Sequence, residues 1–330
     1  MEERVPVVKP LPRISEKEGF QDALAYLEGR MVGKIKSLST PWKKIDDAMV
    51  DGLEWQNTII VGARPGTGKT LFMDQLIKGL FDKNPTENFR VLKFQLEMTG
   101  KVAALREFSA FSEKSYKSVV KDVNYDSLKA YWEYSQKRIK YPVVIVNEQP
   151  TVSEFKATVI DELESNSYEE EGVKKYIPYI VTLDHSKLLK RDRNEKDDLD
   201  MLYNFGMAIT DLKRKYPIIF IIISQLNRNI ESQERSQPGT YGNYINSSDI
   251  FGSDALLQHA DLVIGINRPS NQKINIYGPE RFIIDDDNIL AFHFIKARNG
   301  DTRLSFFRAE YDKMRIVEID PPARSSSSKK

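Results

Sequence analysis

Cysteine is absent from the 330 residues of this chain, and histidine occurs only three times, at His185, His259 and His293. Without cysteine the protein has no disulfides, no thiolate metal ligands and no thiol nucleophile, which fits a reducing compartment. The three histidines do not follow the spacing of zinc ligands, so we expect no zinc site.

Long apolar runs are also missing. The first ten residues, MEERVPVVKP, lack the basic segment followed by an apolar segment that marks a secretory signal. The longest apolar run, residues 218–223, is far too short to span a bilayer. We therefore expect a cytosolic protein that has no membrane partner.

Neither sign of charge is in excess, because 49 Lys and Arg residues are balanced by 48 Asp and Glu residues. Any contact with nucleic acid must then come from a local basic surface rather than from the charge of the whole chain. The charge balance neither supports nor excludes a DNA-binding function.

The most informative stretch that is present is VGARPGTGKT, at residues 61–70. Residues 57–62 read as a buried strand, and residues 71–81 carry apolar side chains at helical spacing, so a glycine-rich turn joins a strand to a helix N-terminus. Backbone N–H groups of such a turn hold phosphate oxygens, Lys69 adds a positive charge, and Thr70 offers a hydroxyl to Mg²⁺. The pattern predicts ATP as the ligand.

One position departs from the strict G-x-x-x-x-G-K-T pattern. Ala63 stands where the first glycine belongs, and Gly62 precedes it. A small residue suffices there if its backbone angles are ordinary. An accidental glycine-rich turn is the alternative, and the strand before and the helix after the turn argue against it.

Short apolar runs alternate with helical patterns after Gly68. Each run is nearly continuous, as in strands that are buried on both faces of a parallel sheet. The sequence therefore predicts an α/β fold with a doubly wound, mostly parallel sheet, whose active crevice lies at the carboxyl ends of the strands. The predicted strands cover residues 91–96, 142–147, 179–184, 218–224, 261–266 and 290–295.

Between the strands the sequence predicts helices and insertions. A capping box at residues 151–154 opens one helix, and residues 199–215 form another. Residues 165–175 and 191–198 read as solvated insertions. Residues 227–249, rich in Ser, Asn, Gly and Gln, read as a long loop of the kind that is usually functional or mobile.

Two carboxylates end predicted strands. Asp184 closes YIVTLD, which would place it beside the phosphate loop to hold Mg²⁺ together with Thr70. Glu97 follows VLKFQL, where a carboxylate is able to accept a proton from the attacking water. A helix N-cap is the alternative role for this Asp, and capping or salt bridging is the alternative for this Glu.

An amide ends another strand, at Gln225 in the SQLNR run of residues 224–228. A neutral amide is suited to sense the γ-phosphate and to pass its presence to the loop that follows. Closing that loop by hydrogen bonds is the structural alternative.

Together these motifs resemble the motor domain of DnaB-type hexameric replicative helicases, in family order from about residue 37 to residue 318. The resemblance implies a RecA-like P-loop NTPase fold, and hydrolysis of ATP with Mg²⁺ that drives 5′ to 3′ movement on single-stranded DNA. It also implies a homo-oligomer, expected to be a hexamer, with a primase or a loader as a further partner. The segments that carry it are ARPGTGKT, FQLEM, the strand-terminal Asp184, SQLNR, QHADLV at 258–263 and KARNG at 296–300.

The resemblance also implies residue roles. The expected catalytic base is Glu97 and the expected γ-phosphate sensor is Gln225. Lys296 and Arg298 match the lysine and the arginine finger that reach into the neighbouring subunit's site, where a guanidinium stabilises transition-state charge. A basic pair on the surface is the plain alternative for these two residues. The remaining expected ligands are the nucleotide-binding Arg64, Pro65, Gly66, Thr67, Gly68 and Lys69, and the metal-binding Thr70 and Asp184.

The N-terminal part of the chain departs from the family. We expect an N-terminal extension at residues 1–36, a motor domain at 37–320 and a disordered tail at 321–330, which leaves no room for the family's primase-docking domain. Residues 15–31 resemble the family's linker helix, which packs on the adjacent subunit. Packing on its own core is the alternative. The apolar side chains at helical spacing are Phe20, Leu24, Leu27 and Met31.

The expected DNA-facing loop also departs from the family. Residues 248–253 read SDIFGS where the family usually shows an Arg-Glu-Ser-Gly-Ser run. Gly252 and Ser253 keep backbone amides that suit phosphates, and the basic candidates on the loop are Arg228 and Arg235.

We weigh two other functions against a ring-forming helicase. A RecA-like strand-exchange or filament-forming DNA-dependent ATPase would use ATP as an assembly switch. A non-motor ring or scaffold would keep nucleotide only for structure. The KARNG segment and Glu97 favour the helicase over the filament, and the complete set of catalytic residues argues against the scaffold.

Overall fold

The structure of the chain, a computed structural model, describes residues 13–326, apart from the side chains of Ser253 and Asp254. Residues 1–12 and 327–330, which hold part of the predicted extension and part of the predicted tail, lie outside the described residues. The chain forms two compact units, Met1–Ser37 and Leu38–Lys330.

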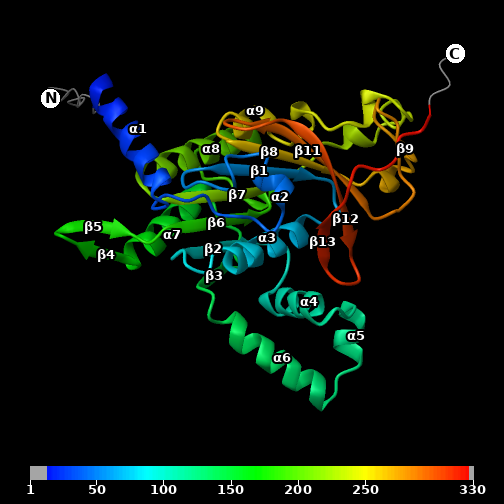
Figure 1. The fold of residues 1–330 in the computed structure, drawn as a ribbon, viewed down its shortest axis with the longest axis horizontal. Coiled ribbons are helices and arrows are strands. Elements are labelled where there is room, and N and C mark those ends of the chain that lie inside the picture. Colours follow the sequence, from blue (N-terminus) through cyan, green and yellow to red (C-terminus); the bar gives the residue numbers. More distant parts are fainter. Residues whose placement is uncertain (1–12, 327–330) are drawn as a thin grey trace. The chain divides into compact units, whose positions relative to one another are not determined.

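The larger unit is built on a nine-stranded sheet with the order β13-β12-β11-β8-β1-β7-β6-β2-β3 (Figure 1). Neighbours within the central part of this sheet are parallel, which confirms the predicted α/β fold with a mostly parallel sheet. The parallel strands are β1 (Thr58–Ala63), β2 (Arg90–Gln95), β3 (Val143–Val146), β6 (Tyr179–Asp184), β7 (Ile218–Gln225) and β8 (Leu262–Asn267).

Three strands at one end of the sheet are antiparallel. They are β11 (Ile289–Ala297), β12 (Arg303–Glu310) and β13 (Arg315–Glu318). The predicted strand at residues 290–295 is therefore present, and it belongs to the antiparallel minority of a sheet that is mostly parallel, as predicted. An antiparallel neighbour needs no helical crossover, and the chain passes from β8 to β11 without an α-helix.

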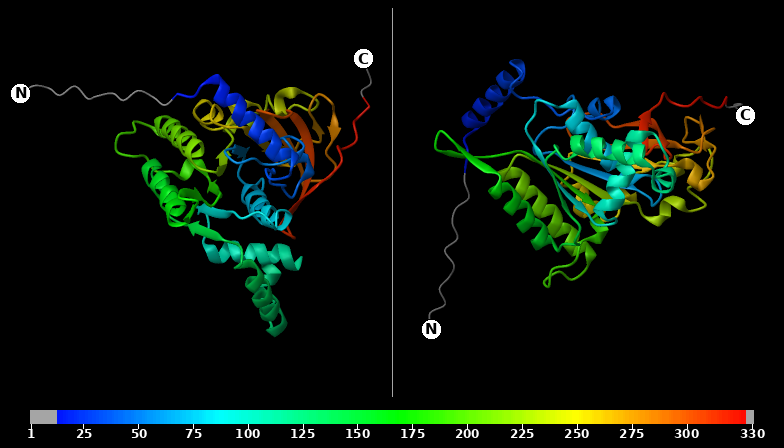
Figure 2. Two further views of the ribbon diagram at one scale, coloured as in Figure 1. Left: turned by 60° about the vertical axis from the view of Figure 1, so that its left-hand side comes forward. Right: turned by 90° about the horizontal axis from the view of Figure 1, so that it is seen from below.

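Helices cover both faces of the sheet (Figure 2). Helix α3 (Lys69–Lys83) packs on one face, where it meets Ile59 and Val61 of β1. Helices α7 (Val152–Ser165) and α8 (Asp198–Lys215) pack on the other face, which receives Ile60. Successive strand residues point to opposite faces, so strands covered on both sides read as continuous apolar runs. Both predicted helices are present, and α7 begins with the expected capping box.

A helical insertion that the sequence analysis did not predict lies between β2 and β3. It contains α4 (Gly100–Ser112), α5 (Tyr116–Lys121) and α6 (Tyr125–Arg138), and it extends away from the sheet (Figure 1). Most side chains of α5 and α6 are exposed, including Tyr125, Leu128 and Trp132. Because little of the insertion is buried, its sequence lacks the clean apolar stripe that marks a packed helix.

The segment at 165–175, expected to be a solvated insertion, is exposed but ordered as a hairpin of β4 (Ser167–Glu170) and β5 (Val173–Tyr176). Its turn residues, Glu171 and Gly172, both have positive φ, as a two-residue hairpin turn requires. The smaller elements of the unit are α2 (Lys43–Asp46), α9 (Ser253–Leu257), β9 (Ile276–Tyr277), β10 (Phe282–Ile283) and the 3₁₀ turns η1 (Ser186–Leu188), η2 (Arg228–Glu231), η3 (Tyr241–Asn243), η4 (Ser247–Asp249) and η5 (Pro269–Gln272).

The sequence predicts a disordered tail from residue 321 onward. Within residues 321–326 the chain instead makes backbone hydrogen bonds to another segment. The Ala323 carbonyl accepts a hydrogen bond from the Ile283 amide at 2.8 Å, and the Ser325 amide donates to the Arg281 carbonyl at 2.8 Å. These bonds pair the segment with β10, because an edge strand offers unpaired backbone groups that a polar tail is able to satisfy.

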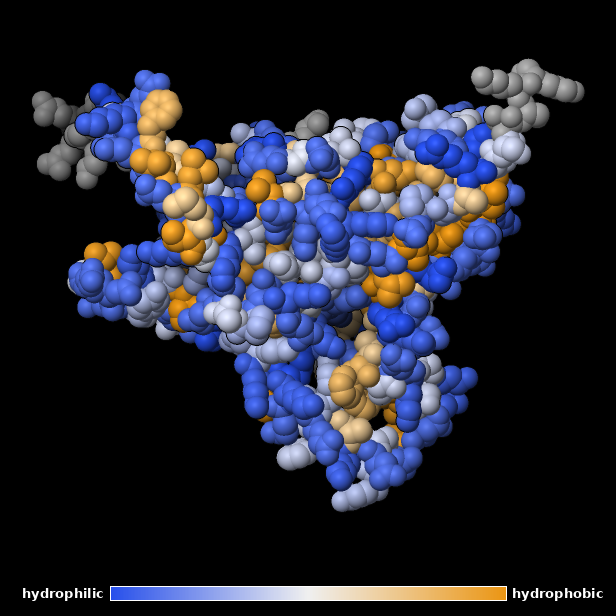
Figure 3. All heavy atoms as spheres, in the orientation of Figure 1, coloured by the Kyte–Doolittle hydropathy of each residue, from blue (hydrophilic) through white to orange (hydrophobic). Residues whose placement is uncertain are grey.

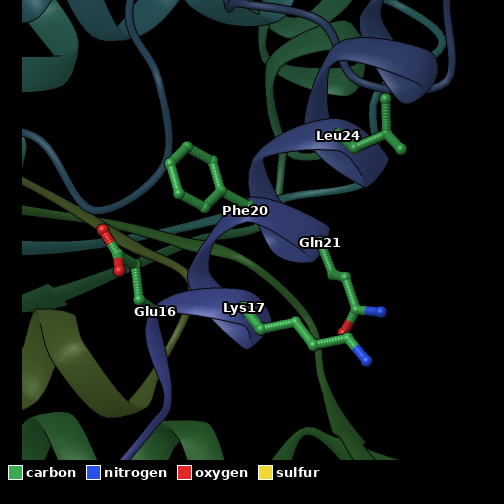
Figure 4. A pocket seen from close by; sticks show the side chains of 5 residues that line it. All are labelled: Glu16, Lys17, Phe20, Gln21 and Leu24. Atoms are coloured by element: carbon green, nitrogen blue, oxygen red, sulfur yellow. The ribbon is translucent and has the colours of Figure 1, made fainter.

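Helix α1 (Glu16–Met31) belongs to the smaller unit and starts with a capping box between Ser15 and Glu18. The apolar side chains noted in the sequence are all exposed on it, and apolar atoms gather over α1 in Figure 3. A hollow on its surface is lined by α1 residues alone (Figure 4). Neither α1 nor another helix within residues 13–326 is long and apolar enough to cross a membrane.

An aromatic stack fixes the start of the larger unit onto α3. The Trp42 and Phe72 rings are parallel with centroids 4.9 Å apart, and the Trp42 indole donates a hydrogen bond to the Ile316 carbonyl of β13 at 3.0 Å. Phe72 is fully buried. The stack therefore joins the segment before β1, helix α3 and the last strand of the sheet.

We predict that Phe72→Ala lowers the free energy of unfolding by about 3–5 kcal/mol, because it leaves a cavity beneath Trp42. The matched control is Leu128→Ala on α6, which removes an exposed side chain and should change stability by less than about 0.5 kcal/mol. Urea unfolding followed by circular dichroism measures both. Equal effects of the two variants would contradict the role of the stack.

Candidate nucleotide-binding site

The glycine-rich turn joins β1 to α3, as the sequence predicts. Gly66 and Gly68 have φ angles of 76° and 99°, in the left-handed region that favours glycine. Ala63 is the last residue of β1 and is not among the residues with positive φ, so its backbone needs no glycine. The departure from the strict pattern is therefore compatible with a phosphate-binding loop.

Lys69 begins α3 with its side chain largely buried, and its ammonium lies 3.4 Å from the Ala63 carbonyl. Burial lowers the pKa of Lys69 below its ordinary value, although the Glu97 and Asp184 carboxylates oppose the shift. An ammonium in this position gains strongly from an anionic ligand, because phosphate oxygens would replace the water that it has lost.

The residues expected to hold the metal are in contact. Thr70 donates a hydrogen bond from its hydroxyl to Asp184 Oδ2 at 2.8 Å, and Asp184 Oδ1 is buried with no hydrogen-bond partner among the described residues. Burial raises the pKa of Asp184 to about 6, against the opposing effect of the Thr70 hydrogen bond. A hydroxyl and a buried, unsatisfied carboxylate oxygen fit Mg²⁺, which takes few protein ligands and completes its shell with phosphate and water.

Glu97 and Gln225 meet at one imidazole that the sequence analysis did not assign. Glu97 Oε1 and the Gln225 amide nitrogen lie 2.9 Å and 3.0 Å from the same His185 atom, Nε2. Glu97 is about 40% exposed, whereas His185 is buried. The structure thus brings the expected base and the expected sensor to the same edge of the sheet as the phosphate loop.

A cleft of about 470 Å³ opens over the phosphate loop. It is lined by predicted residues, including Lys69, Thr70, Glu97 and Gln225, and by residues that no sequence motif indicated, including Arg106, Tyr116, Tyr311 and Met314. The Tyr311 hydroxyl donates a hydrogen bond to the Thr67 carbonyl at 3.1 Å. The helical insertion and the β12–β13 turn therefore form two of the cleft's walls.

The Arg64 side chain points away from the phosphate-binding turn. Its guanidinium donates to Glu231 at 2.7 Å and to the Leu226 carbonyl at 3.0 Å. The predicted nucleotide contact of Arg64 therefore stays a prediction, and its present side-chain partners lie on the segment that follows β7.

Lys296 and Arg298 lie at the opposite edge of the sheet from the cleft. Arg298 pairs with Asp261 at 3.0 Å, and Asp261 also accepts a hydrogen bond from the amide of Thr58, the first residue of β1. The phosphate loop follows the last residue of β1, so the two edges are about 20 Å apart at 3.3 Å per residue. The Lys296 ammonium donates to the Leu257 carbonyl at 2.7 Å.

The loop after β7 has an internal ion pair. Arg235 contacts both carboxylate oxygens of Asp249 and donates to the carbonyls of Gly242 and Tyr244. Arg235 is therefore engaged within the loop, whereas Arg228 is exposed. Gly252 has a φ angle of 67° and stands immediately before Ser253, where α9 begins.

The loop is tied to the end of β7 by backbone hydrogen bonds. The Phe251 amide donates to the Gln225 carbonyl at 2.8 Å, and the Asn227 amide donates to the Asp249 carbonyl at 2.6 Å. The backbone at the end of β7 therefore closes the loop, while the Gln225 side chain faces His185. The two roles considered for Gln225 do not exclude each other.

Several known proteins are similar to this chain in sequence or in structure. The "Replicative DNA helicase DnaB" of Mycoplasma pneumoniae is 24% identical over 311 residues, which cover 88% of this chain and 59% of that protein. The chain thus spans less than two thirds of that relative. A solved structure that is described as an ATPase domain has a TM-score of 0.72 at 16% identity and covers 91% of this chain and 99% of that one.

A second structure, "The Structure Of A DnaB-Like Replicative Helicase And Its Interactions With Primase", has a TM-score of 0.71 at 17% identity. It covers 94% of this chain and 68% of that one. At such identities the likeness shows the fold, which is the RecA-like fold that the resemblance predicted. The model of the DnaB-like helicase C terminal domain matches residues 37–315, so the chain belongs to the DnaB-like helicase family.

Proposed function

We propose that this chain is the motor of a ring-forming, ATP-driven replicative DNA helicase that moves 5′ to 3′ on single-stranded DNA. One observation carries the proposal. The phosphate loop, the expected base and the expected sensor share one edge of the sheet, while the expected arginine finger lies at the other edge. A subunit with this layout needs a neighbour to complete its site, and a closed ring gives every subunit one neighbour on each side.

Hydrolysis follows from the chemistry of the cleft. The loop amides and Lys69 hold the β- and γ-phosphates, and Thr70 and Asp184 would hold the Mg²⁺ that neutralises phosphate charge when bound. Glu97, exposed just after the end of β2, accepts the proton of the attacking water. The Gln225 side chain reaches the γ-phosphate, and its carbonyl bond to Phe251 links that contact to the DNA-facing loop.

The proposal assigns the remaining parts of the chain to assembly and DNA. Helix α1, with its exposed apolar face, packs on an adjacent subunit, and six subunits close the ring. Single-stranded DNA passes along the loop at residues 227–253. A primase or a loader is the expected further partner, and the cytosol is the expected location. These assignments rest on the family resemblance together with the exposed surfaces.

We predict that Lys69→Ala reduces ATP hydrolysis to background, because it removes the charge that faces the phosphates. Glu97→Gln keeps the size of the side chain but accepts no proton, so it should bind ATP and assemble while its turnover falls by about 10² to 10⁴. Phosphate release and binding of a fluorescent ATP analogue measure the two effects. Equal loss of binding and turnover in Glu97→Gln would instead indicate a structural role for Glu97.

We predict that the active site is shared between subunits, so hydrolysis should rise more steeply than linearly with protein concentration. Arg298→Ala and Lys69→Ala should each be inactive alone. Mixed rings contain interfaces that join an intact phosphate loop to an intact finger, so mixing the two variants should restore part of the activity. Wild-type activity proportional to monomer concentration would exclude a shared site.

We predict that DNA binding depends on Arg228 through its charge and on Arg235 through the loop's structure. Arg228→Ala should lower the log–log salt slope by about 0.7 if it removes one phosphate contact on a single strand. Arg235→Ala removes the partner of buried Asp249 and should lower the melting temperature, whereas Arg228→Ala should not. Fluorescence anisotropy over a salt series and thermal melts measure both. An unchanged slope in Arg228→Ala would remove this residue from the DNA-binding surface.

Particle shape tests the ring directly. Electron micrographs with ATP and single-stranded DNA should show closed six-fold particles. Helical filaments on the DNA would instead indicate the strand-exchange type of ATPase. A fork with labelled 5′ and 3′ tails then reports unwinding and its direction.

A further inference from the structure

His185 occupies a position that links two residues of the proposed hydrolytic site. It follows Asp184 at the end of β6, and its imidazole is buried between Glu97, which follows β2, and Gln225, the last residue of β7. The ring reaches both neighbours with Nε2, at 2.9 Å from Glu97 Oε1 and at 3.0 Å from the Gln225 amide nitrogen. Three strands thus converge on one nitrogen atom.

That nitrogen is unable to serve both neighbours at once. An imidazole nitrogen offers either one hydrogen or one lone pair in the plane of the ring, whatever the charge of the ring. A protonated Nε2 donates to the Glu97 carboxylate, whereas a bare Nε2 accepts from the Gln225 amide. If the amide of Gln225 is turned so that its oxygen faces the ring, one N–H is divided between two acceptors. In either orientation Gln225 competes with Glu97.

The other ring nitrogen biases this competition. His185 Nδ1 is buried and has no hydrogen-bond partner among the described residues. An unpaired buried N–H group is rarer in proteins than an under-satisfied acceptor. The environment of Nδ1 therefore favours the tautomer with the proton on Nε2, which donates to Glu97. When the Gln225 amide donates to Nε2, the ring must take the less favoured tautomer. Gln225 is therefore able to leave Nε2 without a large loss of stabilising free energy.

We propose that His185 is a positioning residue that couples the sensor to the base. In the empty cleft Gln225 and Glu97 share Nε2, so the Glu97 carboxylate has only part of a hydrogen bond to hold it. When Gln225 turns toward the γ-phosphate, Nε2 donates to Glu97 Oε1 and fixes the carboxylate, which leaves Oε2 for the water's proton. The inference rests on the proposed hydrolytic function of this site, and it explains how one residue keeps the base unready until nucleotide is bound.

A core histidine without this role would behave differently. It would fill space between the strands, and its replacement would lower stability and nucleotide affinity together with turnover. A positioning residue acts on turnover alone, because the phosphate contacts of the loop and of Lys69 do not involve it. The test therefore needs to separate kcat from nucleotide binding and from stability.

Three replacements of His185 separate the two roles. His185→Gln has a side chain long enough to bring an amide to the position of Nε2, whereas His185→Asn stops at the position of Nδ1. His185→Phe keeps a planar ring and removes both nitrogens. We expect kcat to fall by about 10- to 100-fold in the Asn and Phe variants, since a misplaced catalytic group loses rate on this scale. The Gln variant should recover most of the rate.

The control measurements are ATP-analogue affinity, KM and melting temperature, all of which should stay near wild type in the Gln and Asn variants. Equal kcat in these two variants, or parallel losses of kcat, affinity and stability, would overturn the proposal. If His185→Phe does not fold, the Gln and Asn pair still decides the question, because the two differ by one methylene group.

A double variant tests the link between sensor and base. Gln225→Ala removes the competitor for Nε2, so His185 should hold Glu97 throughout in that variant, and adding His185→Asn should lower kcat by about the same 10- to 100-fold as in the wild-type background. No further loss in the double variant would overturn the relay from Gln225 through His185 to Glu97. The Glu97→Gln variant distinguishes the two levels of the argument: if it hydrolyses ATP normally the proposed function fails, and if only the His185 variants do so the relay alone fails.

Discussion

The parallel register of the central strands is the constraint on which the site depends. Ala63 pairs with Gln225 across β1 and β7, and Gln95 pairs with Asp184 across β2 and β6. Parallel strands in register end at one edge of the sheet, so residues that end different strands are brought side by side. Nothing in the local sequence of Gln225 makes it meet Glu97. Their meeting follows from the strand order, which places β6 and its His185 between β7 and β2.

The antiparallel strand β11 places its last residues at the other edge of the sheet, away from the cleft. Since β11 runs against β8, it ends near Asp261, which precedes β8. The same carboxylate receives the Lys213 ammonium at 2.6 Å, so Arg298 is held by a buried acid that already has a cationic partner. A guanidinium that shares its acid in this way, and that is about half exposed, is available to a phosphate on another molecule. The direction of this one strand thus places Arg298 away from the cleft of its own chain, as the proposed shared site requires.

The sequence was a sufficient guide to the buried centre of the fold and a poor guide to its exposed parts. The central strands are covered on both faces, so burial leaves a continuous apolar record that is readable without the structure. The helical insertion and β13 are partly exposed. Their many polar residues obscure the regular spacing of apolar residues from which a helix or a strand is predicted. The exposed hairpin at residues 167–176 differs from them, because its Glu171-Gly172 turn is a hairpin signal that the sequence does contain. The ion pair between Arg235 and Asp249 could not be predicted from the sequence, because the two residues are distant in sequence and only the folded loop brings them together.

The two carboxylates of the site also differ in a way that sequence position alone does not reveal. Asp184 is nearly inaccessible to solvent, and burial raises its pKa, so its charged form needs a cation beside it. Glu97 is far more accessible and lies where water reaches it. An acid that depends on a cation suits metal binding, and an accessible carboxylate suits proton transfer. The strand ends place both acids at one edge, and their unequal burial, which the packing around β6 produces, is what separates their chemistry.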